Sequence, residues 1–288
     1  MENHSGFLPV EGVSLFRIIH FRVDMAGSLV KNDPEGRIKY FWQDIRSMLD
    51  TEYPQAFMVS EWSDPKEALN GGFHADFLHW VGEYNDLFQK EKARNPFANG
   101  NSFFDKEGKG DISRFLNMYV EQYAATKGKG YISLPIGNHD LIRINNNGRD
   151  QRDLDIIQVF NFTMPNIPFI YYGDEIGMRQ LSGFPAKEGA YLQRAGARTP
   201  LQWSRGINDG FSKASPDKLY FPVDTTDNAP NVDDQQDNPL SLLNFTRKLA
   251  VLHKEQPALT NYAWFVPVYV RKDAYPFIFE RILGKDKF

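Results

Sequence analysis

Short apolar runs alternate with longer segments of helical periodicity along most of this chain. The runs are four to six residues long, contain many β-branched and aromatic residues, and lie at 21–24, 56–61, 73–78, 131–136 and 167–172. The periodic segments, in which apolar residues return every three or four positions, lie at 36–49, 112–125, 154–162 and 240–253. This alternation is typical of βα units and predicts an α/β fold built on a parallel sheet.

Composition limits the classes of function. The chain of 288 residues is long enough for one large domain. Its net charge of −4 argues against nucleic-acid binding, because proteins of that kind carry a basic excess. Cysteine is absent, which excludes a disulfide framework and fits a cytoplasmic protein. No apolar run reaches the roughly 18 residues of a membrane span, and residues 1–12 lack the pattern of a secretory signal.

Two long loops and a change of architecture are also predicted. Residues 95–110 and 179–236 are rich in Gly, Asn, Asp or Pro and show no long period, and long loops within compact domains are usually functional. After Pro257 the pattern changes to short β-like runs at 263–270 and 276–282. We therefore expect a large main domain over 1–256 and the beginning of a small all-β domain over 257–288.

Three acidic residues stand at the carboxyl ends of predicted strands, namely Asp24, Glu61 and Asp140. In a (β/α)8 barrel the carboxyl ends of the strands build the active site, so residues at these positions converge. The long intervals between the three residues each have room for the crossover helix that parallel strands need. The pattern predicts a cluster of carboxylates at one end of the sheet.

Each of these residues, taken alone, also has a structural interpretation. Asp24 fits a helix cap or a salt bridge with Arg22, and Glu61 fits a buried ion pair. Asp140 fits a turn residue, and His139 fits a structural histidine. Structural roles are likewise expected for His74, His79, Asp174 and Glu175, the last two as caps of the turn after the final strand.

Five segments, in this order, resemble the signature segments of the α-amylase family. They are FRVD at 21–24, VSEW at 59–62, GNHD at 137–140, IPFIYYGDEIGM at 167–178 and ARTPLQW at 197–203. The last segment resembles a subgroup of α-glucosidases, oligo-1,6-glucosidases and trehalose-synthase-like enzymes. One segment alone would carry little weight, but five in family order leave little room for chance.

The resemblance implies a retaining glycoside hydrolase acting on α-glucosidic bonds. By it, Asp24 is the nucleophile, Glu61 the general acid/base and Asp140 the stabiliser of the transition state. The residues implied to bind substrate are Arg22, His139 and Arg198. A retaining enzyme of this kind places two carboxyl groups about 5–5.5 Å apart, one ionised to attack and one protonated to donate.

The residues around the first two carboxylates bear on their protonation. Arg22 lies two residues before Asp24, hence on the same face of the strand, where its guanidinium would keep Asp24 ionised. Glu61 follows an apolar run and precedes Trp62, a setting that would raise the pKa of its carboxyl. These expectations match the roles of nucleophile and acid.

By the same resemblance, the chain holds strands four to eight of the barrel, and the first three strands have no counterpart. Residues 1–20 show neither the helix nor the Gly that precede the nucleophile strand in the family, so N-terminal truncation is expected. Five strands cannot close an eight-stranded barrel, because its diameter and tilt depend on strand number. The expected fold is a partial (β/α)8 barrel, impaired unless a complementing chain or an oligomer supplies the rest.

The expected ligand is an α-glucan or α-glucoside oligosaccharide, with neither nucleic acid nor membrane as a partner. No cofactor and no metal are predicted, since the Asp- and Asn-rich stretch 224–237 lacks the spacing of an EF-hand. Two alternatives stay open. One is a non-catalytic carbohydrate-binding or partner subunit, which would be free to lose the three carboxylates; the other is an inactive gene remnant, which the missing strands favour.

Overall fold

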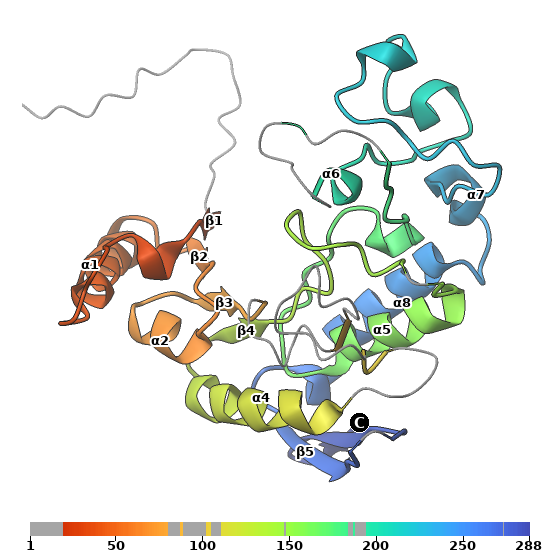
Figure 1. Ribbon diagram of the computed structural model, residues 1–288. Coiled ribbons are helices and arrows are strands. Elements are labelled where there is room, and N and C mark those ends of the chain that lie inside the picture. Colours follow the sequence, from red (N-terminus) through yellow and green to blue (C-terminus); the bar gives the residue numbers. More distant parts are fainter. Residues whose placement is uncertain are drawn as a thin grey trace, which may run out of the picture.

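A four-stranded parallel sheet forms the first part of the fold. The computed structural model describes residues 20–79, 87–88, 102–104, 111–146, 148–183, 187, 194–272 and 274–288. The strands are adjacent in chain order, as β1 (His20–Val23), β2 (Phe57–Ser60), β3 (Ala75–Phe77) and β4 (Tyr131–Ser133). Figure 1 shows them side by side near the centre of the molecule. Four of the five predicted strands are thereby confirmed; β1 is shifted by one residue from its predicted bounds, and the other three are shorter than predicted.

The fifth predicted strand, 167–172, is not formed. Its Ile167 N–H donates to the Ile132 carbonyl of β4 at 2.9 Å, but Leu134 N donates to the side-chain oxygen of Asn166 at 3.2 Å and not to the backbone of this segment, so the ladder is not continued. The carbonyls of Tyr171 and Tyr172 accept hydrogen bonds from Asp174 N and Arg143 Nη1 instead. Among the described residues the sheet therefore stays open, and no closed barrel is present.

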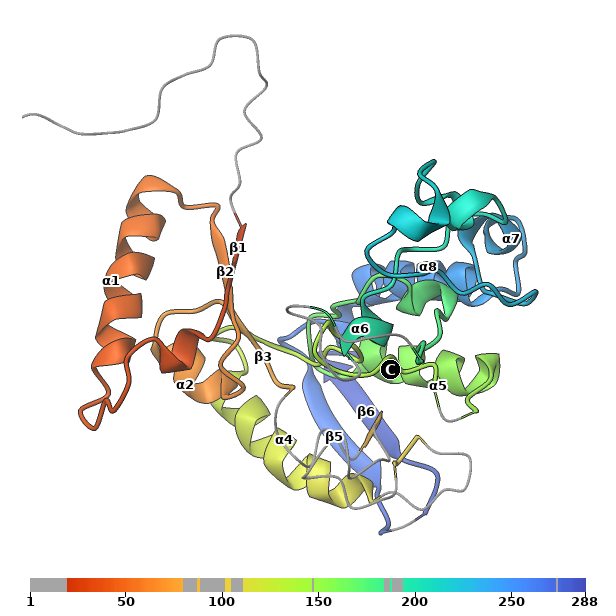
Figure 2. The same cartoon turned by 45° about the horizontal axis from the view of Figure 1, so that its top comes forward.

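Four long helices and the shorter α2 pack around the sheet in the described part of the chain. The four predicted ones are confirmed as α1 (Arg37–Glu52), α4 (Ile112–Thr126), α5 (Gln151–Thr163) and α8 (Leu242–Glu255). The sequence analysis missed α2 (Pro65–Asn70), which begins with a proline and is capped by Asp64 accepting from Glu67 N. Figures 1 and 2 both place α1 at the β1 end of the sheet, and α5 with α8 at the other end.

The predicted loop 179–236 contains four short helices in its described parts, with irregular segments between them. These are α6 (Arg194–Ala197) and α7 (Val232–Gln236), with the 3-10 helices η3 (Ile207–Gly210) and η4 (Pro216–Lys218). Arg179 anchors the loop, because its Nε donates to Asp224 Oδ2 at 2.7 Å. Further 3-10 helices are η1 (Ala26–Ser28), η2 (Asp174–Ile176) and η5 (Pro257–Leu259). The other predicted loop, 95–110, lies outside the described residues apart from 102–104.

The two β-like runs after Pro257 form an antiparallel sheet, as expected. Its strands are β5 (Trp264–Tyr269), β6 (Ile278–Leu283) and β7 (Asp286–Lys287). Phe265 of β5 lies in the same buried cluster as Tyr119 and Tyr123 of α4. Figure 2 shows β5 and β6 running alongside α4. The small sheet therefore shares its core with the helical layer.

The two largest buried clusters among the described residues lie on different parts of the sheet. One packs α1 and α2 on the β1–β2 end and includes Trp42, whose Nε1 donates to the Ala26 carbonyl at 3.0 Å. The larger one joins α4, α5 and β4 with Phe265. Burial of such side chains stabilises a fold by roughly 1.5–3 kcal/mol each. Within the described part of the chain, no helix has both the length and the apolar character needed to cross a membrane.

Candidate active site

The carboxyl ends of β1 and β2 bring one arginine between two acidic side chains. Arg22 Nη2 donates to Oε2 of Glu61 at 2.8 Å, while Nη1 donates to Oδ1 of Asp24. Parallel pairing of Arg22 with Val59 sets the two strand ends side by side. Glu61 is only 8% exposed, whereas the Asp24 side chain is 71% exposed. The salt bridge and the buried ion pair considered from the sequence are thus parts of one network.

The predicted increase in the pKa of Glu61 is wrong, because the pKa of this carboxyl is lowered. The hydrogen bond with the His79 side chain is the largest cause, and it outweighs burial, which acts in the opposite direction. The Met25 N–H, which donates to Oε2 at 3.2 Å, a hydrogen bond with Asp24 and the positive charge of Arg22 lower the pKa further. Several donors therefore favour the carboxylate form.

The apolar neighbour on which the raised pKa rested points elsewhere. The Trp62 ring packs edge-on against Phe73, with ring centroids 6.3 Å apart, and joins the α1–α2 cluster. Successive side chains at a strand end point to opposite faces, so the ring of Trp62 and the carboxyl of Glu61 face different surroundings.

His79 is a site residue for which the sequence predicted only a structural role. It follows β3, is 3% exposed, and its Nε2 lies 3.4 Å from Glu61 Oε1. Its Nδ1 lies 3.3 Å from the Phe77 carbonyl oxygen. The available signal was its place after a strand, the same position that singled out Asp24 and Glu61.

A cavity of about 170 Å³ opens beside these groups. Its polar wall comes from three different strand ends and the turn after β4, and its apolar wall comes mainly from rings. The lining includes Arg22, Glu61, His79, Asn138 and His139, together with Phe77, Phe169 and Tyr171. A cavity of this size has room for about one sugar ring, and it joins Arg22 and Glu61 to His139 in one space.

Asp140 lies on the turn after β4 between two arginines. Arg198 Nη2 and Arg194 Nη1 lie 3.0 and 3.1 Å from its Oδ1. His139 Nε2 lies 3.7 Å from Oδ2, and Arg198 Nε donates to the His139 carbonyl at 2.8 Å. The structure thus brings together all three residues predicted around this position. Arg194 was not predicted from the sequence. It lies four residues before Arg198, a spacing that places two side chains on the same side of a helical turn.

A buried ion pair supports this turn from below. Arg143 and Asp174 are both fully buried, with Nη1 and Oδ1 3.2 Å apart. Burial raises the pKa of Asp174 to about 7, against the opposing charge of Arg143. The predicted role of Asp174 as a turn cap is therefore wrong. A Cβ on Gly137 would lie 2.5 Å from Asp174 Oδ2, so the ion pair lies directly against the turn.

A second buried carboxyl lies beneath Glu61. Asp76 of β3 is fully buried and accepts hydrogen bonds from Ser60 Oγ at 2.6 Å and from Trp62 N at 2.9 Å. Burial raises its pKa to about 7. Because Ser60 and Trp62 flank Glu61, this carboxyl fixes the backbone that carries the buried glutamate.

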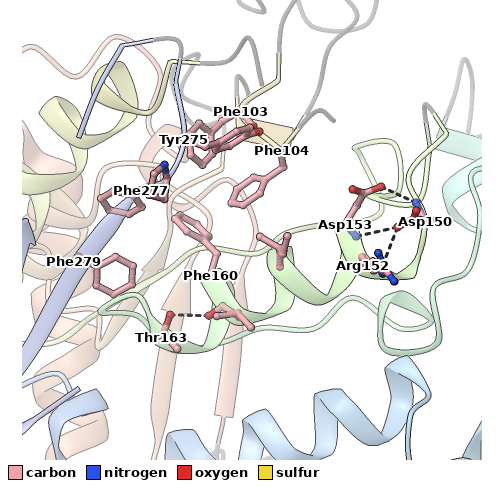
Figure 3. A pocket seen from close by; sticks show the side chains of 13 residues that line it. Phe103, Phe104, Asp150, Arg152, Asp153, Phe160, Thr163, Tyr275, Phe277 and Phe279 are labelled. Atoms are coloured by element: carbon pink, nitrogen blue, oxygen red, sulfur yellow. Dashed lines mark hydrogen bonds between the residues drawn. The ribbon is translucent and has the colours of Figure 1, made fainter. Parts of the chain in front are cut away.

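A larger cavity, with a volume of about 680 Å³, lies elsewhere. Figure 3 shows it between α5 and β6, where aromatic rings form most of its wall. The dashed bonds at its rim belong to the N-terminal cap of α5, in which Asp150 and Asp153 bond to backbone N–H groups. No three His, Asp or Glu side chains among the described residues come together as a metal site. Of the residues predicted from the sequence, Arg22, Glu61 and His139 line the smaller cavity, which marks it as the chemical site. Asp24, Asp140 and Arg198 are not part of its lining and reach it through their contacts with Arg22 and His139.

The comparison with known protein families supports the resemblance. Residues 20–262 match the family model described as alpha amylase, catalytic domain. The chain belongs to the α-amylase family. The matched range contains Asp24, Glu61 and Asp140, and it includes η5 and ends just before β5.

This α-amylase family chain is similar to proteins with different names. It is 28% identical over 193 residues to the amino acid transporter heavy chain SLC3A1 of Homo sapiens, covering 67% of this chain and 27% of that protein. It is 29% identical over 287 residues to the salivary alpha-glucosidase of Aedes aegypti, covering 89% of this chain and 48% of that protein.

Among solved structures, the fold resembles that of trehalose-6-phosphate hydrolase from Bacillus licheniformis. The TM-score is 0.70 at 19% identity, covering 93% of this chain and 55% of that one. At this identity the likeness concerns the fold alone. The chain spans between about a quarter and a half of the length of these two curated relatives.

Proposed function

We propose that this chain carries the catalytic half of a retaining glycoside hydrolase that acts on α-glucosidic bonds of oligosaccharides or α-glucans. The observation that carries the proposal is the shared guanidinium of Arg22, which contacts Asp24 and Glu61 at the edge of a sugar-sized cavity. Two carboxyl groups on adjacent strands are what double displacement needs. The salivary alpha-glucosidase relative supports the same class of substrate.

The proposed reaction has two steps with Asp24 and Glu61 in separate roles. Asp24, exposed and held by Arg22, attacks the anomeric carbon, while the bond to the leaving oxygen breaks and that oxygen takes a proton from Glu61. Water then attacks the glycosyl–Asp24 ester and gives a proton to Glu61, so the configuration is retained. The enclosed position of Glu61 suits a group that must pass a proton rather than meet solvent.

Asp140, His139 and Arg198 are proposed to bind the hydroxyl groups of the sugar. The two arginines at Asp140 hold its carboxylate in one orientation, and Asn138 fixes the turn by accepting from Asp140 N at 2.8 Å. A preset acceptor costs little reorganisation as charge develops on the sugar ring. His139, with a half-exposed side chain, faces the same cavity.

The four strands with segment 167–172 are proposed to correspond to strands four to eight of a (β/α)8 barrel, within a catalytic domain over 1–256 followed by the beginning of a β domain over 257–288. The outer side of β1 supports this correspondence, because it pairs with no strand in the described part of the chain and three of its four residues are exposed. We propose that a complementing chain or a second copy covers this side and completes the pocket. The cytoplasm is the proposed location, supported by the absence of cysteine.

Hydrolysis of a chromogenic α-glucoside by the purified chain tests the proposal. The wild type, Asp24→Asn and Glu61→Gln are compared, with Asp44→Asn on the exposed face of α1 as the matched control. We expect release of chromophore with an α-configured product, which each active-site substitution reduces at least about 100-fold and the control leaves unchanged. Light scattering in the same buffer reports whether activity accompanies association.

The outcomes separate the parts of the proposal. Activity that survives Asp24→Asn would remove Asp24 from the role of nucleophile. If the folded wild type were inactive both as a monomer and as an oligomer, catalysis by this chain would be refuted, and the family membership would stand.

A non-catalytic partner subunit is the second candidate. The similarity to an amino acid transporter heavy chain favours it. The presence of Asp24, Glu61 and Asp140 weighs against it, because a subunit without catalysis has no need of all three.

A further inference from the structure

Glu61 is contacted differently at its two oxygens. Oε2 accepts from Arg22 Nη2 at 2.8 Å and from Met25 N at 3.2 Å. Oε1 faces His79 Nε2 at 3.4 Å. Both side chains of this second contact are nearly enclosed, with exposed fractions of 7% for Glu61 and 4% for His79. A proton on this carboxyl therefore belongs on Oε1, on the side of the histidine.

The other ring nitrogen of His79 fixes the tautomer. Nδ1 lies 3.3 Å from the Phe77 carbonyl oxygen, which can only accept, so Nδ1 carries hydrogen. In the neutral ring, Nε2 then presents a lone pair to Oε1. Exactly one further proton fits between the two atoms, either on Oε1 of a neutral pair or on Nε2 of a charged pair.

This arrangement resolves a conflict in the proposed mechanism. A general acid must hold a proton near neutral pH, but the pKa of Glu61 is lowered, chiefly by its hydrogen bond with His79. The carboxyl is then ionised before substrate binds. His79 Nε2, 3.4 Å from Oε1, can exchange a proton with this carboxyl at the moment when the leaving oxygen needs one.

We propose that His79 is a positioning residue for Glu61, which holds the carboxyl against the cavity and exchanges with it the proton passed to the leaving oxygen. The proposal rests on the proposed function. In the first step a proton moves from His79 Nε2 to Glu61 Oε1 and on to the glycosidic oxygen as the C1–O bond breaks and Asp24 bonds to C1. In the second step the proton of the attacking water returns through Glu61 to His79. No proton is gained or lost over the cycle.

The surrounding charges are compatible with this exchange. Arg22 and Asp24 face Glu61 from β1, and Asp76 of β3 lies behind its backbone. His139 lines the same cavity from the turn after β4. Arg22 contacts Oε2 rather than Oε1, so it favours the charged state of the pair without occupying the path of the proton.

The test is a titration of the Glu61 carboxyl by carbon NMR on protein labelled at glutamate, with Glu61→Gln to assign the signal. His79→Phe removes both hydrogen bonds of the ring, and His79→Gln keeps a neutral donor and acceptor. His253→Gln is the matched control, because His253 Nδ1 also bonds a carbonyl, that of Phe162 at 2.7 Å, on the distant helix α8.

We expect the Glu61 titration to move to higher pH by about one unit or more in His79→Phe, by less in His79→Gln, and not at all in the control. We also expect His79→Gln to lower kcat about tenfold or more with little change in KM, and to alter the pH profile. A Glu61 titration unmoved in whichever His79 variant folds would overturn the proposal. The titration needs no turnover, so an inactive wild type would refute the proposed function while this result still decides the Glu61–His79 pairing.

Discussion

Arg22 Nη2 donates to Glu61 Oε2 at 2.8 Å across the first pair of parallel strands. The same guanidinium holds Asp24, so the proposed nucleophile and the proposed acid/base share one cation. A planar guanidinium can serve two carboxylates at fixed angles, which an ammonium cannot do. This single side chain therefore sets the relative position of the two groups that double displacement requires.

Replacement of Arg22 should uncouple these carboxylates. In Arg22→Gln the positive charge that helps to lower the pKa of Glu61 is lost, so that pKa is expected to rise. Activity on a chromogenic α-glucoside should fall about 100-fold or more, because Asp24 loses its orientation. Arg37→Gln, which removes only an exposed ion pair with Glu35, serves as the control in the same assay and titration. An unaltered kcat/KM in Arg22→Gln would contradict the shared-cation interpretation.

The two arginines at Asp140 should act as a unit. Arg194→Lys and Arg198→Lys each keep the charge but lose the planar fork, so each should weaken substrate binding or turnover. Because both contact Oδ1, the double variant should lose less than the product of the two single losses. A double-mutant cycle on kcat/KM measures this coupling. Strict additivity would show that the two contacts are independent.

The sequence predicted the elements better than the contacts between them. Strand ends at Asp24, Glu61 and Asp140 were visible because period and residue type report local structure. The segment 167–172 misled because its apolar, aromatic composition suits a strand, whereas the side chain of Asn166 takes the Leu134 N–H, and Asp174 N and Arg143 Nη1 take the carbonyls of Tyr171 and Tyr172. Local pattern does not record which partner a backbone group will find.

The environment of Glu61 shows the same limit for electrostatics. Trp62 is the neighbour of Glu61 in sequence, and this apolar neighbour led to the prediction that burial dominates the pKa of Glu61. The decisive neighbour is His79, 18 positions along the chain and at the end of the adjacent strand in space. A pKa depends on the nearest charges and donors in three dimensions, which no spacing rule supplies.

Gly137 should tolerate no side chain. In Gly137→Ala the new Cβ would lie 2.5 Å from Asp174 Oδ2, so either the buried ion pair or the turn carrying His139 and Asp140 must shift. We expect a loss of about 1–3 kcal/mol in the free energy of unfolding, together with reduced activity. Gly206→Ala is the matched control, since its Cβ would meet only Ser204 Oγ at 3.4 Å. Urea unfolding of both variants gives the comparison, and equal midpoints would contradict the close approach.

Asp76 should make stability depend on pH. Its pKa is raised to about 7 by burial, whereas an aspartate in an unfolded chain titrates near about 4. Between these values the folded chain keeps a proton that the unfolded chain has lost, so the free energy of unfolding falls as pH rises. The slope approaches about 1.4 kcal/mol per pH unit for one proton. Stability from this group is therefore complete below about pH 4 and is lost as pH rises toward 7.

Asp76→Asn should abolish that part of the slope. The amide oxygen can still accept from Ser60 Oγ and Trp62 N, so the contacts beneath Glu61 are kept without a titrating proton. The free energy of unfolding of the variant, measured with urea relative to the wild type, should then be higher at pH 8 than at pH 5 by on the order of 2 kcal/mol. Asp174, whose pKa is also raised to about 7, is present in both proteins and cancels in the difference. If the variant and the wild type differed in the free energy of unfolding by the same amount at pH 5 and pH 8, the buried Asp76 carboxyl would be ionised. Its bonds to Ser60 and Trp62 would then be charge-assisted.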